Sequence, residues 1–181
     1  GSSRGIGKAT ALLFAKEGAK VVVNCDKVEK EATQVVDEIK KLGSDAVFVK
    51  CDISNEKEVK QMMEETVKKF GKIDILINNA GIVFDVPFVE KTVEQWKKTL
   101  EVNLISVFLC SKYVAPYMKK QKYGKIVNVS STNAIDSFSP EAMDYDASKA
   151  GIIILTRDLA KELAQYGINV NAIAPGWVNT K

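Results

Sequence analysis

The chain opens on the glycine-rich stretch Gly1-Ser2-Ser3-Arg4-Gly5-Ile6-Gly7, which leads straight into a helical segment. Glycines in such a turn let the backbone pass close to a pyrophosphate, and the first turn of a helix offers unpaired N–H groups and a positive dipole end. The spacing, G-x-x-x-G-x-G, departs from the G-x-G-x-x-G fingerprint of dinucleotide-binding loops. On its own, this stretch is compatible with an ordinary tight turn as well as with a nucleotide site.

Helices and strands alternate along the rest of the chain. The apolar periodicity predicts helices over Ile6–Glu17, Glu29–Leu42, a charged segment after Ser54 and Asn55 that reaches about Phe70, Val93–Lys120 with a break near Glu101, and Met143–Gln165. Short apolar runs predict strands over Val21–Cys25, Ala46–Val49, Ile73–Ile77, Lys125–Val129 and Ile168–Ala174. Apolar strands separated by helices indicate an α/β fold of the Rossmann type, a doubly wound parallel sheet with helices on both faces. We expect one domain over residues 1–181.

Composition excludes several classes of chemistry. The 181 residues hold 26 Lys and Arg interleaved with 23 Asp and Glu, so no basic stripe predicts a nucleic-acid partner. Histidine is absent, which removes His-based metal sites and Ser-His-Asp triads, and we expect no metal. Three scattered cysteines do not make a disulfide framework, and no apolar run is long enough to span a membrane. A cytoplasmic location is expected.

Tyr145 and Lys149 stand four residues apart in a predicted helix, so their side chains share one face. A tyrosine has an ordinary pKa of about 10, and a neighbouring ammonium lowers that value by favouring the tyrosinate. Such a pair can move a proton in a chain without histidine. Tyr/Lys pairs are also common on helix surfaces, so the pair needs support from other motifs.

Four motifs occur together along the chain: the opening loop, Asn78-Asn79-Ala80-Gly81, Tyr145-x-x-x-Lys149 and Pro175-Gly176. With this order and these intervals, the whole chain resembles the short-chain dehydrogenase/reductase family. The resemblance implies a strand before Gly1 and a substrate lid after Lys181. We therefore expect the sequence to be a fragment of a longer chain.

The resemblance also implies roles for individual residues. Tyr145 would protonate a carbonyl oxygen, Ser131 would align it, and Lys149 with Asn103 would resupply the proton through water. Ser130 is an alternative to Ser131, because either could face inwards. The residues implied in cofactor binding are Gly1, Ser3, Arg4, Gly5, Ile6, Gly7, Asp52, Ile53, Asn79, Ala80, Gly81, Tyr145, Lys149, Pro175, Gly176, Val178 and Thr180. For Asp52, a role in a helix cap or turn is the alternative.

The implied cofactor is NAD(P)(H). Two features of the sequence give opposite indications of whether its adenosine ribose carries a 2′-phosphate, as in NADP(H), or a free hydroxyl, as in NAD(H). Arg4 can pair with a 2′-phosphate, whereas Asp26 would repel one if its side chain pointed inwards. Cys25 stands where NAD-dependent relatives often carry an acid. We favour NADP(H) over NAD(H).

The expected activity is hydride transfer between NAD(P)(H) and a carbonyl or secondary alcohol. The Val-Asn-Val-Ser-Ser strand and the Pro-Gly-Trp-Val segment look closest to the 3-oxoacyl-[acyl-carrier-protein] reductases of fatty acid biosynthesis, which act on acyl thioesters. The alternatives are a sugar or polyol dehydrogenase of the same family and a non-catalytic NAD(P)-binding regulator. By analogy with the family, we expect a homotetramer.

Overall fold

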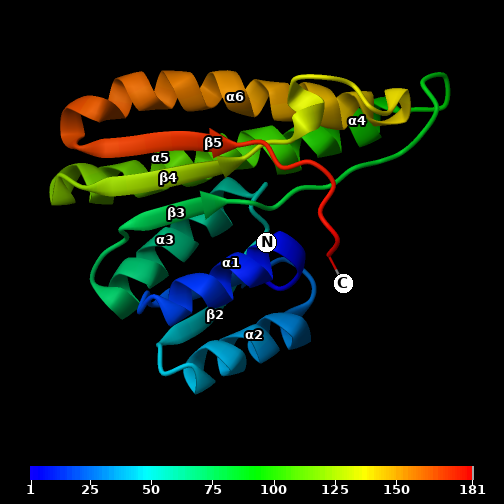
Figure 1. Ribbon diagram of the computed structural model, residues 1–181. Helices are drawn as coiled ribbons and strands as arrows, with labels where there is room; N and C mark the ends of the chain where they lie inside the picture. The colour runs from blue at the N-terminus through cyan, green and yellow to red at the C-terminus, as the bar shows by residue number, and fades with distance from the viewer. Residues whose placement is uncertain (181) are drawn as a thin grey trace. The chain divides into compact units, whose positions relative to one another are not determined.

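The computed structural model describes residues 1–180, which form an α/β structure of parallel strands flanked by helices (Figure 1). The described residues fall into two compact units. The first comprises Gly1–Gly71 together with Asn179 and Thr180, and the second comprises Lys72–Val178.

The first unit contains a two-stranded parallel sheet and three helices. The elements are α1 (Gly5–Lys16), β1 (Val21–Cys25), α2 (Glu29–Lys41), β2 (Ala46–Lys50) and α3 (Glu56–Phe70). Helix α2 packs on both strands and against α1, and its inward face carries Ala32, Val35 and Ile39, which are almost completely buried. Local chemistry sets the helix ends, because Asn55 caps the start of α3 and Gly71 ends it in the left-handed conformation.

The second unit contains a three-stranded parallel sheet in the order β3-β4-β5, visible side by side in Figure 1. Its elements are β3 (Ile75–Asn78), α4 (Val93–Leu100), a π-helical segment (Glu101–Ile105), α5 (Ser106–Gln121), β4 (Gly124–Val129), two short 3₁₀ turns (Thr132–Ala134 and Pro140–Ala142), α6 (Met143–Leu163), a further 3₁₀ turn (Ala164–Tyr166) and β5 (Ile168–Ile173). Helix α5 packs on β3 and β4, and α6 packs on β4 and β5.

The loops that follow β4 and β5 lie at one edge of this sheet because the strands are parallel. The Ser130 N–H donates to the Ile173 carbonyl at 2.8 Å, and the Thr132 N–H donates to the Pro175 carbonyl at 3.0 Å, so the backbone pairing continues beyond the strands. The carboxyl edge of a parallel α/β sheet is the usual place for a ligand. This edge carries the predicted site residues of the second unit.

The predicted elements occur with their ends shifted by at most two residues. One shift of two residues concerns the strand predicted from Ile73, which begins at Ile75 because the Ile73 backbone bonds to the Gln121 side chain instead of entering the ladder. Another concerns the helix predicted to Gln165, which ends at Leu163 and continues as a 3₁₀ turn. The break predicted near Glu101 is the π-helical segment. Cys25, Cys51 and Cys110 are all buried, and no disulfide joins them. Among residues 1–180, no helix combines the length and apolar character that crossing a membrane requires.

Candidate active site

Lys149 lies at the centre of the candidate site in the second unit. Its side chain is almost fully buried, and its ammonium donates to the Val129 carbonyl at the end of β4 at 2.7 Å. The ammonium also lies 5.5 Å from the centroid of the half-buried Tyr145 ring. Burial lowers the pKa of Lys149 from 10.5 to about 8, so the group is still largely protonated at neutral pH. A buried positive charge therefore stands beside a tyrosine.

Asn103 fastens the loop after β3 to α6 from within the π-helical segment. Its side-chain amide donates to the Ile82 carbonyl at 2.9 Å and to the Ser148 hydroxyl at 3.1 Å, while its oxygen accepts the Ile82 N–H at 2.8 Å. The side chain is completely buried. Single π-helical turns are rare and often occur at functional sites. Here the turn brings one polar side chain between two segments far apart in the sequence.

Gly81 lies close to the side chains of Asn103 and Lys149. A Cβ added at Gly81 would lie 3.3 Å from Asn103 Oδ1 and 3.5 Å from Lys149 Nζ. The first of these distances is tighter than most contacts that a real Cβ makes. The structure therefore brings Gly81, Asn103, Tyr145 and Lys149 together. Because glycine has no Cβ, the backbone at residue 81 can pass close to the Lys149 ammonium.

Replacing Asn103 with alanine should free the Ile82 backbone and loosen the loop after β3. Because a backbone donor and acceptor lose their partners together, we expect the free energy of unfolding to fall by about 2–3 kcal/mol. Urea denaturation would measure this loss, and amide hydrogen exchange at Ile82 should become faster. The exposed Asn169 provides the control, since Asn169→Ala should change neither quantity appreciably. Unchanged protection of the Ile82 amide would contradict the role given to Asn103.

The two adjacent serines after β4 have different environments. Ser130 is buried, and its hydroxyl donates to the Lys149 carbonyl at 2.8 Å, which fastens α6 to the strand end. The Ser131 hydroxyl accepts the Asn133 N–H at 3.2 Å and begins the short 3₁₀ turn. Ser130 is thus engaged with backbone, whereas Ser131 bonds only within its own turn among the described residues.

The opening loop in the first unit has the features of an anion-binding turn. Gly5 adopts a φ of +55°, Gly7 is buried, and the first turn of α1 carries no acidic residue and no side-chain cap at Arg4. Ser3 is buried, and Arg4 is exposed. The N–H groups at the start of α1, at the positive end of the helix dipole, can therefore bind an anion, and a cofactor pyrophosphate fits this role.

Asn24 on β1 holds this loop and was not singled out from the sequence. Its backbone exchanges bonds with Ser2 through Ser2 N–H to Asn24 O at 2.9 Å and Asn24 N–H to Ser2 Oγ at 2.7 Å. Its side-chain amide donates to the carbonyls of Val49 and Cys51 beside it. An asparagine inside an otherwise apolar strand was the available signal, because the amide of a partly buried asparagine needs hydrogen-bond partners.

The remaining predicted residues of the first unit are placed as follows. Asp52 accepts bonds from the N–H and hydroxyl of Ser54 at 2.9 and 2.6 Å, which is the turn role left open for it. Ile53, beside it, is half-buried, and Thr180 lies against Gly5, where an added Cβ would be 3.5 Å from the Thr180 methyl group. Cys25 is buried and Asp26 is exposed.

The predicted residues divide between the two units. Those in the first are Gly1, Ser3, Arg4, Gly5, Ile6, Gly7, Asp52, Ile53 and Thr180; those in the second are Asn79, Ala80, Gly81, Asn103, Ser131, Tyr145, Lys149, Pro175, Gly176 and Val178. Within the second unit, Pro175 and Gly176 lie beside Thr132, next to Ser131. Each unit thus gathers its own predicted residues.

Comparison with known proteins identifies the family of this chain. The family described as short chain dehydrogenase matches residues 1–181. A 3-oxoacyl-[acyl-carrier-protein] reductase from Synechocystis sp. is 45% identical over 180 residues, which is 99% of this chain and 72% of the relative. Acetoin dehydrogenase YohF from Salmonella typhimurium has a TM-score of 0.92 at 33% identity, covering 99% of this chain and 71% of that one. A protein from Burkholderia xenovorans assigned to the short-chain dehydrogenase/reductases gives the same TM-score and identity, covering 97% of this chain and 66% of that one. The chain therefore belongs to the short chain dehydrogenase family, whose members are NAD(P)-dependent oxidoreductases.

Proposed function

We propose that this chain reduces the keto group of a 3-oxoacyl thioester, with Tyr145 as the proton donor. The observation that carries the proposal is the buried Lys149 ammonium, which lies 5.5 Å from the Tyr145 ring centroid and would lie 3.5 Å from a Cβ added at Gly81. The name of the similar protein from Synechocystis sp. supplies the substrate class.

The protein groups divide the work of the reaction. When bound, NAD(P)H would supply a hydride for the carbonyl carbon. Tyr145 gives its phenolic proton to the carbonyl oxygen, so the products are a secondary alcohol and the oxidised cofactor. Ser131 donates a hydrogen bond to the same oxygen and aligns it, because Ser130 is already bonded to the Lys149 carbonyl. Lys149 and Asn103 return a proton to Tyr145 through water.

The cofactor residues are proposed in two groups. In the first unit, Gly1, Ser3, Arg4, Gly5, Ile6, Gly7, Asp52 and Ile53 would bind the adenine and pyrophosphate, and the Thr180 hydroxyl would reach the cofactor. In the second unit, Asn79, Ala80 and Gly81 would lie along the adenosine ribose and the cofactor backbone, and Tyr145, Lys149, Pro175, Gly176 and Val178 would bind the nicotinamide side. NADP(H) is favoured over NAD(H), because Arg4 is exposed with no cap role and Asp26 lies exposed at the surface.

Assembly and location complete the proposal. The exposed apolar side chains Ile105, Phe108 and Ile154, on the π-helical segment, α5 and α6, support a homotetramer formed through these helices. Residues 1–181 would act as one cofactor-binding domain. Three free cysteines are compatible with the reducing cytoplasm.

The decisive experiment follows nucleotide absorbance in the whole protein with four combinations of cofactor and substrate. We expect acetoacetyl thioester with NADPH to turn over fastest, ahead of the same thioester with NADH and of sugars or polyols with either oxidised cofactor. Faster oxidation of a polyol would replace the proposed substrate class with that of a polyol dehydrogenase. Cofactor binding without turnover of any substrate would instead indicate a non-catalytic regulator.

A further inference from the structure

A buried ion pair that the sequence does not announce stands next to Tyr145. The Lys91 ammonium lies 2.5 Å from Asp144 Oδ1 and donates to the Phe84 carbonyl at 2.6 Å. The second carboxylate oxygen accepts the Thr99 hydroxyl at 2.6 Å. The exposed fractions of the Lys91 and Asp144 side chains are 3% and 0%, so both charges are removed from water.

This cluster joins three segments of the second unit. Lys91 ends the loop that follows Gly81, Thr99 lies on α4 just before the π-helical segment, and Asp144 lies in the first turn of α6. A backbone bond from the Val86 N–H to the Glu141 carbonyl at 3.3 Å links the same loop to the residues before α6. The loop after β3 is therefore fixed to the start of the helix that carries Tyr145.

Stability alone is a poor explanation for such a pair. Removing two charges from water is costly, and apolar side chains of similar volume often stabilise a fold as well or better. The pair instead fixes the orientation of the Asp144 side chain. Both oxygens of Asp144 are held, and although burial by itself would raise its pKa, the bonds from Lys91 and Thr99 hold the pKa below its usual range, so the carboxylate stays charged.

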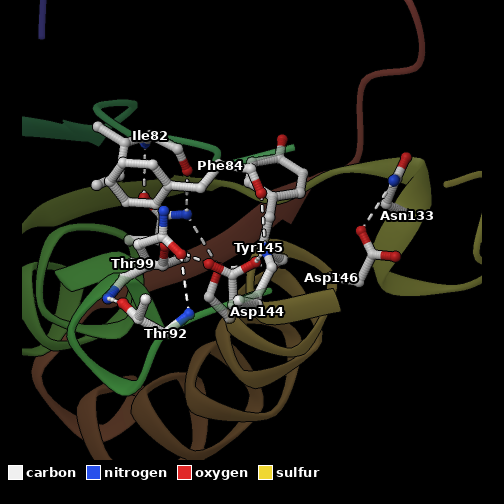
Figure 2. Close-up of polar contacts among 12 residues, drawn as sticks. Ile82, Phe84, Thr92, Thr99, Asn133, Asp144, Tyr145 and Asp146 are labelled. Atoms are coloured by element: carbon white, nitrogen blue, oxygen red, sulfur yellow. Dashed lines mark hydrogen bonds and ion pairs between the residues drawn. The ribbon is translucent and has the colours of Figure 1, made fainter. Parts of the chain in front are cut away.

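Fixing Asp144 fixes the rotation of the first turn of α6. Successive helical residues are about 100° apart around the axis, so the direction of Asp144 determines the direction of Tyr145. Asp146 is held from the other side, because its carboxylate accepts the Asn133 side-chain amide at 2.8 Å. Figure 2 shows Asp144 turned towards Thr99 and Asp146 turned towards Asn133, on either side of Tyr145.

We propose that Asp144, held by Lys91 and Thr99, is a positioning residue that aims the Tyr145 hydroxyl and couples it to the loop after Gly81. Asp144 touches neither substrate nor cofactor and acts through Tyr145. This inference rests on the proposed function, in which Tyr145 donates the proton.

Two sets of variants of the whole protein test it with the thioester assay. The double variant Lys91→Met/Asp144→Asn leaves no unpaired buried charge, so it should fold. Its kcat is expected to fall by about 10–100-fold, since a misdirected reacting group costs rate. The KM for the thioester and the Kd for NADPH should change little. A folded double variant with wild-type kcat would overturn the proposal.

Thr99 provides an independent test with a conservative rescue. Thr99→Val should lower kcat, and Thr99→Ser, which keeps the hydroxyl, should restore it. The matched control is Thr156→Val, because Thr156 is also buried and bonded, but stands about three turns further along α6. Thr156→Val should lower thermal stability without lowering kcat. If Thr99→Val behaved in the same way, the cluster would be structural only.

The Tyr145→Phe variant distinguishes failure of the proton-donor role of Tyr145 from failure of the positioning role of Asp144. If that variant keeps turnover, the proposed role of Tyr145 fails, and the positioning role fails with it. If Tyr145→Phe is inactive while the double variant has wild-type kcat, the positioning role alone is refuted.

Discussion

Replacing Tyr145 with phenylalanine is expected to lower kcat by about 10²–10⁴-fold, the range that a well-placed general acid contributes. Phenylalanine keeps the ring beside the Lys149 ammonium, 5.5 Å from its centroid in the native protein, and removes only the hydroxyl. The loss should therefore appear in the chemical step and not in packing. Affinity for NADPH should stay close to that of the wild type.

Steady-state turnover of the thioester gives kcat, and fluorescence titration with NADPH gives the cofactor affinity. Tyr123, an exposed tyrosine between α5 and β4, supplies the matched control, because Tyr123→Phe makes the same chemical change away from Lys149. Only the Tyr145 variant should lose activity. Retained turnover in Tyr145→Phe would refute the assignment of the proton donor.

Replacing Lys149 with methionine is expected to separate function from stability. Burial lowers the pKa of Lys149 from 10.5 to about 8, so the folded state binds this proton less tightly than the unfolded state. Below pH 8 the amine is protonated in both states. Keeping the buried ammonium charged then lowers the free energy of unfolding by about 3 kcal/mol, since each pKa unit corresponds to 1.36 kcal/mol. Between pH 8 and 10.5 the unfolded chain holds more protons, so stability rises with pH. Above 10.5 the cost has vanished.

Methionine cannot carry this charge, so the variant should lack the pH-dependent cost. It also loses the bond to the Val129 carbonyl, a contribution of about 1.5–3 kcal/mol for a charged donor. At pH 7 the two effects nearly cancel, and the variant should be as stable as the wild type or more so by about 1 kcal/mol. Its kcat should nevertheless fall by about 10²-fold or more, because the ammonium beside Tyr145 is gone.

Urea denaturation of both proteins between pH 7 and pH 11 measures the difference. Relative to Lys149→Met, the wild type should gain about 3 kcal/mol as the pH rises through this window. Lys161→Met is the control, since Lys161 lies exposed on the same helix and should show no such trend. A stability difference that does not depend on pH would contradict a buried, weakly held proton at Lys149.

The ends of most elements could be predicted because they depend on neighbouring residues. Gly43 and Gly71 adopt positive φ angles, which glycine reaches without strain, and they stop α2 and α3 where the pattern of apolar residues stops. The break in the helix near Glu101 was also predicted, but its π-helical form was not. Within that segment, Asn103 makes three side-chain bonds whose partners come from a loop and another helix, so they lie outside the local sequence pattern.

The sequence by itself determined the α/β class, the family and the residues proposed for proton transfer, because apolar periodicity and motif spacing are local properties of the chain. The tertiary structure alone decided which polar residues meet. Lys91 and Asp144 are 53 residues apart, and in the sequence each resembles any charged surface residue. Their pairing requires the fold to bring the loop after β3 next to the start of α6. Burial then removes both charges from water, so that the pair holds one geometry. The opening glycine loop could likewise be recognised from the sequence, whereas the bonds between Asn24 and Ser2 that hold it were shown only by the tertiary structure.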